Sequence, residues 1–199
     1  MERQSNKAPI RACVLAAGTS TRFGATKLVQ LLRGRPLVQH ALLAARGACG
    51  EEVYLVIGHD RESVLTASAG LCNNVVVNTD YKNGIGTSIG AGVRACGDGA
   101  DAVVVLLGDQ PLVTTEHLLS LIDKWSGADN EIVASVFEGI KGPPILFPSK
   151  AFAAMSELGG DSGAKSLLAD TRFDVCTVDC PEAGIDVDTP EMLTDLIGG

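Results

Sequence analysis

Residues 102–111 read AVVVLLGDQP, and they carry the clearest indication of the architecture. Every residue from Ala102 to Leu107 is apolar, whereas a strand with one face in water alternates apolar and polar residues. Such a strand is covered on both faces, which is typical of parallel sheets in α/β proteins. In these sheets ligands bind beyond the carboxyl ends of the strands. We therefore expect a buried central strand and a functional loop that begins at Gly108 and Asp109.

Short apolar runs alternate with helix-length amphipathic stretches on both sides of this strand. The expected strands are 10–15, 53–57, 74–78, 102–107, 131–137, 145–147 and 173–178. The expected helices are 36–48, 61–69, 87–96, 115–126, 149–158, 162–169 and 190–197. This alternation predicts an α/β fold with right-handed crossovers, namely a three-layer Rossmann-like sandwich with a mostly parallel central sheet. Residues 138–148 break the alternation and predict an antiparallel insertion.

Length and charge limit the kinds of function. The 199 residues suit one domain, 1–199, in which residues 1–9 form a polar tail. The formal net charge of −8 argues against a sequence-independent nucleic-acid binder, which needs a cationic surface. The longest aliphatic run, Ala102 to Leu107, is far shorter than the roughly 20 residues that span a bilayer. We expect neither a nucleic-acid partner nor a membrane.

The cysteines give no sign of a zinc site or of a disulfide framework. Their positions are 13, 49, 72, 96, 176 and 180, without a C-x-x-C pair and without a histidine cluster nearby. A chain of this length buries a core large enough to be stable without disulfides. We expect reduced thiols in a cytoplasmic protein.

A glycine-containing loop follows the first expected strand. Residues 15–27 read LAAGTSTRFGATK, in which small residues let the backbone approach a ligand and Arg22 and Lys27 supply positive charge. Inward backbone N–H groups together with Arg and Lys are what a triphosphate requires. The loop is not a P-loop, because its glycines are six apart and the lysine lies three residues beyond the second. We expect a phosphate site here rather than a solvated surface turn.

Carboxylates stand at two further places. Asp109 follows the buried strand, and Mg²⁺ prefers one or two carboxylates together with phosphate oxygens and water. Asp186 and Asp188 come immediately before the helix expected at 190–197. From residue chemistry alone, Asp188 or Thr189 is also a good N-cap for that helix. Metal binding and helix capping both stay open for Asp186 and Asp188 at this point.

A second glycine-rich loop, residues 83–90, leads into an expected helix. Its G-x-G-x-x-x-G pattern, with Asp109 nineteen residues after Gly90, is close to the spacing of a dinucleotide-binding unit. The first glycine of such a unit follows its strand at once, whereas five residues separate Asn78 from Gly84. We therefore disfavour a dehydrogenase.

The motifs as a set resemble those of a known group of enzymes. The pattern L-A-A-G-x-S-x-R-F-G-x-x-K resembles the signature loop of the small nucleotidyltransferases, and G-D-Q-P and D-x-D-T-P-E resemble two further motifs of that family. Residues 141–147 and 158–164 are similar to the G-x-P-x-L-F and G-D-x-G-A elements of molybdenum cofactor cytidylyltransferases. Two positions depart from the pattern, with Pro143 where His is common and Phe23 where Met is common.

The resemblance implies roles for individual residues. Arg22 and Lys27 are implied to be catalytic, because they clamp phosphates and stabilise the transition state. Asp109 and Asp188 are implied to hold Mg²⁺, with Asp186 as the reserve candidate. The implied nucleotide-binding residues are Leu15, Ala16, Ala17, Gly18, Arg22, Lys27, Ser88 and Asp109.

The implied reaction transfers CMP from CTP to the terminal phosphate of the molybdenum–pterin cofactor and releases pyrophosphate. The sequence L-A-A-G, in place of the L-A-G-G typical of related guanylyltransferases, favours CTP and makes Ala17 the position of interest for base choice. A molybdoenzyme that receives the product is an implied partner. Two alternatives stay open: a guanylyltransferase or other NTP transferase with another phosphorylated acceptor, and a non-catalytic carrier or insertion chaperone for the molybdenum cofactor.

Overall fold

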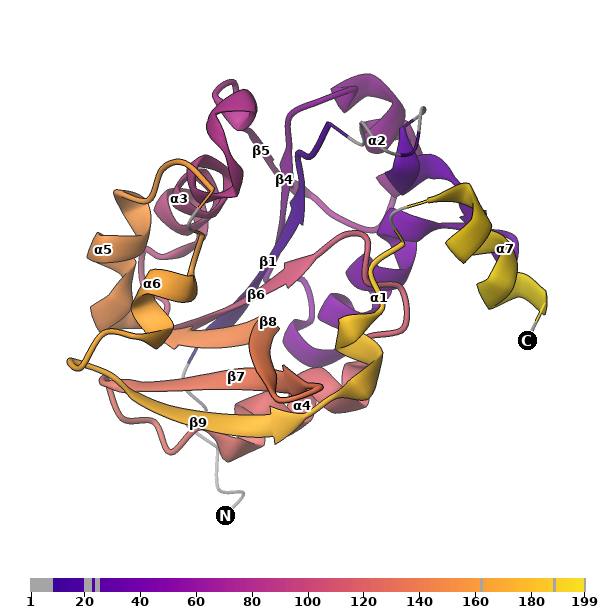
Figure 1. Ribbon diagram of the computed structural model, residues 1–199. Coiled ribbons are helices and arrows are strands. Elements are labelled where there is room, and N and C mark those ends of the chain that lie inside the picture. Colours follow the sequence, from indigo (N-terminus) through magenta and orange to yellow (C-terminus); the bar gives the residue numbers. More distant parts are fainter. Residues whose placement is uncertain (1–8, 20–22, 24–25, 162, 188, 199) are drawn as a thin grey trace, which may run out of the picture.

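The structure is a computed structural model that describes residues 9–19, 23, 26–161, 163–187 and 189–198 (Figure 1). Within these ranges, seven strands form one sheet in the order β5-β4-β1-β6-β8-β7-β9. The strands are β1 (Ile10–Ala16), β4 (Val53–Ile57), β5 (Asn74–Val77), β6 (Ala102–Leu107), β7 (Glu131–Phe137), β8 (Ile140–Pro148) and β9 (Asp174–Asp179). A short antiparallel ribbon pairs β2 (Leu31–Leu32) with β3 (Arg35–Pro36).

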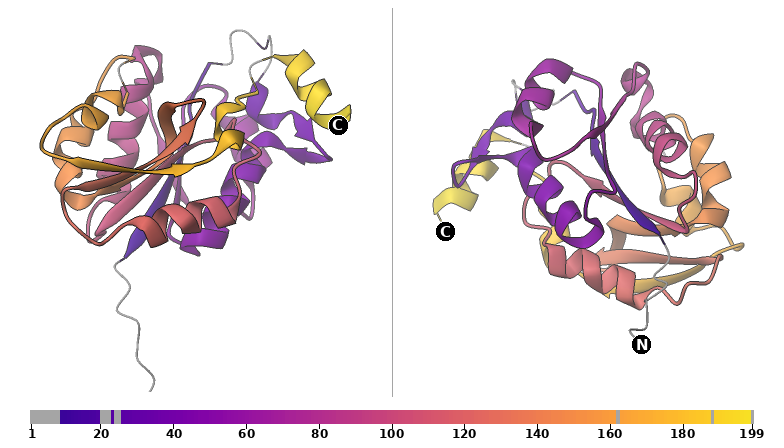
Figure 2. Two further views of the ribbon diagram at one scale, coloured as in Figure 1. Left: turned by 60° about the horizontal axis from the view of Figure 1, so that its bottom comes forward. Right: turned by 180° about the vertical axis from the view of Figure 1, so that it is seen from behind.

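Helices cover both faces of the sheet and make three layers (Figures 1 and 2). One face packs against α1 (Leu37–Cys49), α2 (Arg61–Ser68) and α4 (Thr115–Lys124). The other face packs against α3 (Ile85–Cys96), α5 (Phe152–Ser156) and α6 (Lys165–Leu168). The last helix, α7 (Pro190–Gly198), lies beside the ribbon, where Leu32, Leu37, Val187 and Leu193 form a separate apolar cluster. The predicted three-layer α/β fold is confirmed.

The central strands are covered on both faces, as their continuous apolar runs predict. In β1, Ala12 and Val14 face the layer of α1, whereas Cys13 and Leu15 face the layer of α3. β1 pairs in parallel with both β4 and β6. The carboxyl ends of these three strands therefore meet at one edge of the sheet, which is where the loops after them gather.

The insertion at 138–148 is antiparallel, but its strand is longer than expected. β8 runs from Ile140 to Pro148, not only over 145–147, and it pairs antiparallel with both β6 and β7. Its first half contains Gly142, Pro143 and Pro144, residue types that argue against a strand because proline cannot donate to a ladder. The register shift in β7 at Ala134 and Ser135 accommodates this segment.

The helices and the cysteines have the following local features. Thr114 caps α4, since its hydroxyl accepts from the N–H of His117 at 3.2 Å. All six cysteines are free. Among the helices that the structure describes, none is long and apolar enough to cross a membrane. α6 is only four residues long, whereas a helix over 162–169 was expected.

Glycine lets α3 pack closely on β1. A Cβ added at Gly92 would collide with the sulfur of Cys13 and lie 3.0 Å from Cγ2 of Val56. Both neighbours are fully buried, so neither has free space into which it can move. The close approach sets the position of α3, which carries part of the wall of the pocket described below.

We expect Gly92→Ala to lower the free energy of unfolding by about 1–2 kcal/mol. Overpacking of a core typically costs about 1–3 kcal/mol, which outweighs the roughly 1 kcal/mol that alanine gains over glycine in a helix. Urea unfolding measures the change, and the double variant with Cys13→Ala should regain part of it because the sulfur is gone. Gly159→Ala, at a site with open space around an added Cβ, is the control. Wild-type stability for Gly92→Ala would contradict the packing argument.

Candidate active site

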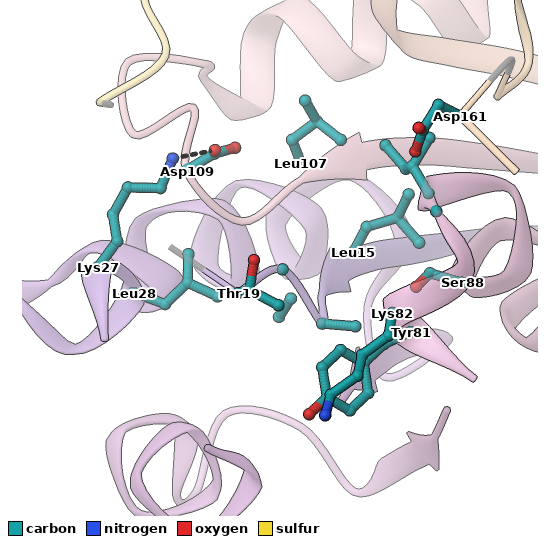
Figure 3. A pocket seen from close by; sticks show the side chains of 15 residues that line it. Leu15, Thr19, Lys27, Leu28, Tyr81, Lys82, Ser88, Leu107, Asp109 and Asp161 are labelled. Atoms are coloured by element: carbon teal, nitrogen blue, oxygen red, sulfur yellow. Dashed lines mark hydrogen bonds and ion pairs between the residues drawn. The ribbon is translucent and has the colours of Figure 1, made fainter. Parts of the chain in front are cut away.

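A pocket of about 360 Å³ opens at the carboxyl ends of β1 and β6 (Figure 3). Its size lies within the roughly 300–1,000 Å³ that is typical of small-molecule sites. Its walls are Leu15, Ala16, Ala17, Gly18, Thr19, Lys27, Leu28, Tyr81, Lys82, Gly84, Ile85, Ser88, Leu107, Asp109 and Asp161. Seven of the eight residues predicted to bind the nucleotide therefore surround one cavity. The eighth, Arg22, lies outside the described residues. That these residues bind a nucleotide stays a prediction.

Lys27 and Asp109 form an ion pair at one side of this pocket. The Lys27 Nζ lies 2.6 Å from the Asp109 Oδ2, and the two side chains are only 10% and 22% exposed. Lys27 begins a short 3₁₀ helix, Lys27–Val29, whereas Asp109 lies in the turn directly after β6. Each charge compensates the desolvation of the other, because an unpaired charge at this depth would be costly.

Asp60 holds the turn that precedes Lys27. The hydroxyl of Thr26 donates to the Asp60 carboxylate, and the hydroxyl of Ser63 donates to its other oxygen at 2.8 Å. These hydrogen bonds lower the pKa of Asp60 below its usual value. Asp60 precedes α2 as its N-cap and lies in the left-handed region, with φ of 45°.

Gln110 ties the loop after β6 to two segments that are distant in sequence. Its side chain is 2% exposed, and its amide donates to the carbonyl of Ala183 at 2.7 Å and to that of Pro143 at 3.4 Å. The two carbonyls fix the orientation of the amide, because the reverse orientation would place oxygen against oxygen. Among the described residues, the Gln110 Oε1 has no hydrogen-bond partner. The N–H of Val187 also donates to the Asp109 carbonyl at 3.2 Å.

His117 connects α4 to β7 through a hydrogen bond. Its Nε2 lies 2.7 Å from the hydroxyl of Ser135, which donates to the carbonyl of Pro144 at 2.7 Å. Burial lowers the pKa of His117, and the charge of Glu182 opposes that shift in part. The neutral imidazole is therefore favoured here, which fits a structural role rather than a catalytic one.

The described residues fit a divalent cation whose ligands are one or two carboxylates together with phosphate oxygens. The hydrogen bond between Val187 and Asp109 brings the chain at Asp186 beside the loop after β6. Within the described ranges, no three side chains of His, Cys, Asp or Glu gather into a metal site. Mg²⁺ needs only one or two carboxylates when phosphate oxygens and water complete its shell.

Asp188, the other predicted ligand, lies outside the described residues. The N-cap of α7 is Thr189, whose hydroxyl accepts from the N–H of Met192 at 3.3 Å. Capping is thus a role that Thr189 fills, and the prediction of metal binding by Asp188 stays a prediction.

Eight residues that line the pocket are not among the predicted nucleotide-binding residues, and they include Tyr81, Lys82 and Asp161. Tyr81 and Lys82 lie across the pocket from Asp109 (Figure 3). A Cβ at Gly58 would lie 2.8 Å from the Cβ of Tyr81 and 2.9 Å from that of Ala17, so this glycine admits both. The signal that the sequence offers for Tyr81 is Gly58, the glycine that follows β4.

Ser88 was predicted, and the structure explains its placement. Its side chain is 5% exposed, and its hydroxyl accepts from the amide of Asn78 at 2.9 Å. The same amide donates to the hydroxyl of Thr87 at 3.0 Å. Asn78, which is also buried, therefore fixes the first turn of α3 against the end of β5.

Comparison with known proteins identifies a family and several relatives of this chain. Residues 12–175 match the family described as the MobA-like NTP transferase domain. The purine catabolism protein PucB of Bacillus subtilis is 32% identical over 188 residues, which cover 89% of this chain and 90% of PucB. The bifunctional protein GlmU of Streptomyces coelicolor is 35% identical over 134 residues, and the match covers 65% of this chain but only 28% of GlmU.

The fold has close relatives among solved structures. Rv0371c from Mycobacterium tuberculosis superposes with a TM-score of 0.84 at 29% identity, over 96% of this chain and 98% of that one. A second structure of Rv0371C, in complex with manganese, superposes with a TM-score of 0.79 at 26% identity, over 96% and 99% of the two chains. These neighbours agree with the three-layer architecture.

We expect Gln110→Leu to lower the free energy of unfolding by about 1–3 kcal/mol. The substitution removes the donor to the Ala183 carbonyl, and a buried acceptor without a partner costs about that much. Urea denaturation measures the loss. Gln30→Leu is the control, because the amide of Gln30 donates only across 3.4 Å to Thr26 and its removal should cost less than about 0.5 kcal/mol. Equal losses for the two variants would count against the tethering role of Gln110.

Proposed function

This chain belongs to the MobA-like NTP transferase family, and we propose that it transfers CMP from CTP to the terminal phosphate of the molybdenum–pterin cofactor, with release of pyrophosphate. The observation that supports the proposal most directly is the Lys27–Asp109 pair inside the pocket that the L-A-A-G loop lines. A cation suited to phosphate and a carboxylate suited to a divalent metal stand side by side there. A metal-bound triphosphate requires both.

The reaction is an in-line displacement at the α-phosphorus of the nucleotide. An oxygen of the acceptor phosphate forms a bond to that phosphorus while the bond to the leaving pyrophosphate breaks. Negative charge grows on the equatorial and leaving oxygens, so positioning and electrostatic stabilisation supply the catalysis. A phosphate monoester is largely ionised at pH 7, since its second pKa is about 6, and no general base is needed.

Lys27 and Arg22 are proposed to clamp the phosphates and to stabilise the developing charge. Lys27 is paired with Asp109, so its charge stays compensated until phosphate oxygens take the place of the carboxylate. Asp109 and Asp188 are the proposed carboxylate ligands, with Asp186 as the reserve. When bound, Mg²⁺ would neutralise part of the charge on the triphosphate.

The loop after β1 and the start of α3 are proposed to bind the base and the ribose. Leu15, Ala16, Ala17 and Gly18 bring the backbone to the wall of the pocket, and Ser88 faces it from α3. Ala17 is 5% exposed and is the proposed determinant of the preference for CTP. A molybdoenzyme that takes up the product is the proposed partner.

The decisive experiment measures pyrophosphate release with each of the four NTPs, with and without the molybdenum–pterin cofactor. We expect release only with CTP and only in the presence of the cofactor. Release with GTP instead would make the protein a guanylyltransferase. Tight binding of the cofactor without CTP-dependent release would make it a carrier or insertion chaperone.

We expect Asp109→Ala to lower kcat at least about 10²-fold, which is the scale of losing one preorganised electrostatic contact. Steady-state pyrophosphate release measures the change. Asp129→Ala is the matched control, because Asp129 is an exposed carboxylate in a loose ion pair with Lys150 at 3.8 Å. Near-wild-type turnover of the Asp109 variant would exclude a role in metal binding.

Lys27→Ala should likewise depress kcat, with Lys150→Ala as the control. A rise in KM for CTP at unchanged kcat would show that Lys27 binds substrate and transition state equally well. In that case Lys27 would be a binding residue and not a catalytic one.

A further inference from the structure

The segment directly after β4 contacts both ends of the glycine-containing loop that follows β1. At the first end, the N–H of His59 donates to the carbonyl of Ala17 at 3.3 Å, which continues the parallel pairing of β1 with β4. At the second end, the hydroxyl of Thr26 donates to the carboxylate of Asp60. Two consecutive residues after β4 are therefore bonded to the start and to the end of this loop.

The carboxylate of Asp60 is itself held in place, although Asp60 is exposed. One of its oxygens accepts from Thr26 and the other accepts from the hydroxyl of Ser63 in α2 at 2.8 Å. Its backbone adopts the left-handed region, with φ and ψ both 45°, a conformation that aspartate and asparagine tolerate better than other non-glycine residues. The acceptor for Thr26 is thus fixed at the start of a regular helix.

Thr26 connects this acceptor to Lys27. It directly precedes the 3₁₀ helix Lys27–Val29, and its carbonyl accepts from the N–H of Val29 at 3.3 Å. The N–H of Gln30 donates to the carbonyl of Lys27 at 3.0 Å, and the 3₁₀ helix contacts α2. The backbone of Lys27 is therefore attached to α2 through its preceding residue as well as through this contact.

The anchor lies outside the pocket, whereas the lysine that it holds lies inside. Neither Thr26 nor Asp60 is among the described residues that line the pocket, but Lys27 is, and its Nζ lies 2.6 Å from Asp109 (Figure 3). Any effect of the anchor on a reaction in the pocket must pass through the placement of Lys27. A misplacement of about 1 Å can cost about 10²-fold in rate.

We propose that Asp60 is a positioning residue, which fixes Lys27 for the transfer reaction by accepting the hydrogen bond of Thr26. The inference rests on the proposed function, in which Lys27 stabilises the charge that develops on the phosphates. Without the acceptor, Lys27 keeps its charge but loses its fixed distance from the reacting phosphorus.

The first test removes the donor. Thr26→Val keeps the shape of the side chain without its hydroxyl, and we expect it to lower kcat about fivefold to tenfold, a part of what full misplacement costs. Thr26→Ser keeps the hydroxyl and should restore turnover. Thr66→Val is the matched control, because the hydroxyl of Thr66 donates only to the carbonyl of Glu62 in its own helix. Equal kcat values for Thr26→Val and Thr66→Val would overturn the proposal.

The second test removes the acceptor. Asp60→Ala should lower kcat as much as Thr26→Val does, and the variant with both changes should be no slower than either, because the two residues share one hydrogen bond. Asp60→Asn keeps an oxygen that can accept and tolerates the left-handed backbone, so it should stay near wild-type turnover. Loss of activity in Asp60→Asn equal to that in Asp60→Ala would overturn the role as acceptor.

The third test asks whether Asp60 acts through Lys27. In a Lys27→Ala background, Asp60→Ala should produce no further loss of kcat, because the side chain that it positions is gone. A second loss of full size in that background would show that Asp60 acts elsewhere, and the proposal would fail.

A fourth measurement does not depend on the reaction. In both Thr26→Val and Asp60→Ala, the amide hydrogens of Val29 and Gln30 should exchange at least about threefold faster in NMR experiments, because the turn opens locally. The amide of Leu118 in α4 reports global stability and should keep its rate. Unchanged exchange at Val29 and Gln30 would overturn the proposal. If exchange changes as expected but the wild type releases no pyrophosphate, the proposed function fails while the anchoring of Lys27 stands.

Discussion

The parallel register between β1 and β6 is the constraint on which the site depends. Leu15 pairs with Leu107 in this register, and the N–H of Gly108 donates to the Leu15 carbonyl at 2.9 Å. Two strands that are far apart in the chain thus end at the same level, so the loops after them start side by side. The pairing of Lys27 with Asp109 follows from this, because each residue belongs to one of those loops. Alternate side chains of both strands pack into opposite helical layers, so a slip of one residue would exchange the side chains that face each layer.

Glycines let neighbouring segments pack closely together, and this packing shapes the walls of the pocket. Gly58, Gly84 and Gly92 each stand where a Cβ would meet a neighbouring segment at less than van der Waals distance. Glycine at these positions permits close contact: it allows Tyr81 to approach Ala17, Asp161 to approach α3, and α3 to approach β1. The walls are consequently made by backbone contact between segments that have no common pattern in the sequence.

The sequence predicts the features that depend on local pattern. The parallel strands and the pocket residues of 15–27 and 108–111 belong to this class, because continuous apolar runs and loop position reveal them. The length of β8 is underestimated from the sequence because its prolines argue against a strand. The strands β2 and β3 are too short to show a hydrophobic period. Tyr81 and Lys82 are not assigned to the site from the sequence because tertiary packing brings them to the pocket, whereas Asp161 belongs to the G-D-x-G-A element but has no role assigned from the sequence. The family is confirmed at the level of NTP transferases, whereas the cytidylyl specificity, the pterin acceptor, the use of Mg²⁺, the single-domain organisation and the roles of all the predicted site residues stay predictions.

The apolar cluster of Leu32, Leu37, Val187 and Leu193 joins two segments that flank the pocket. Leu32 belongs to the ribbon that follows Lys27, whereas Val187 is bonded through its N–H to the loop that carries Asp109. The segment that follows Lys27 and the segment at Asp186 are therefore anchored in the same packed unit. A displacement of α7 would therefore act on both of these segments at once, and through them on two sides of the pocket.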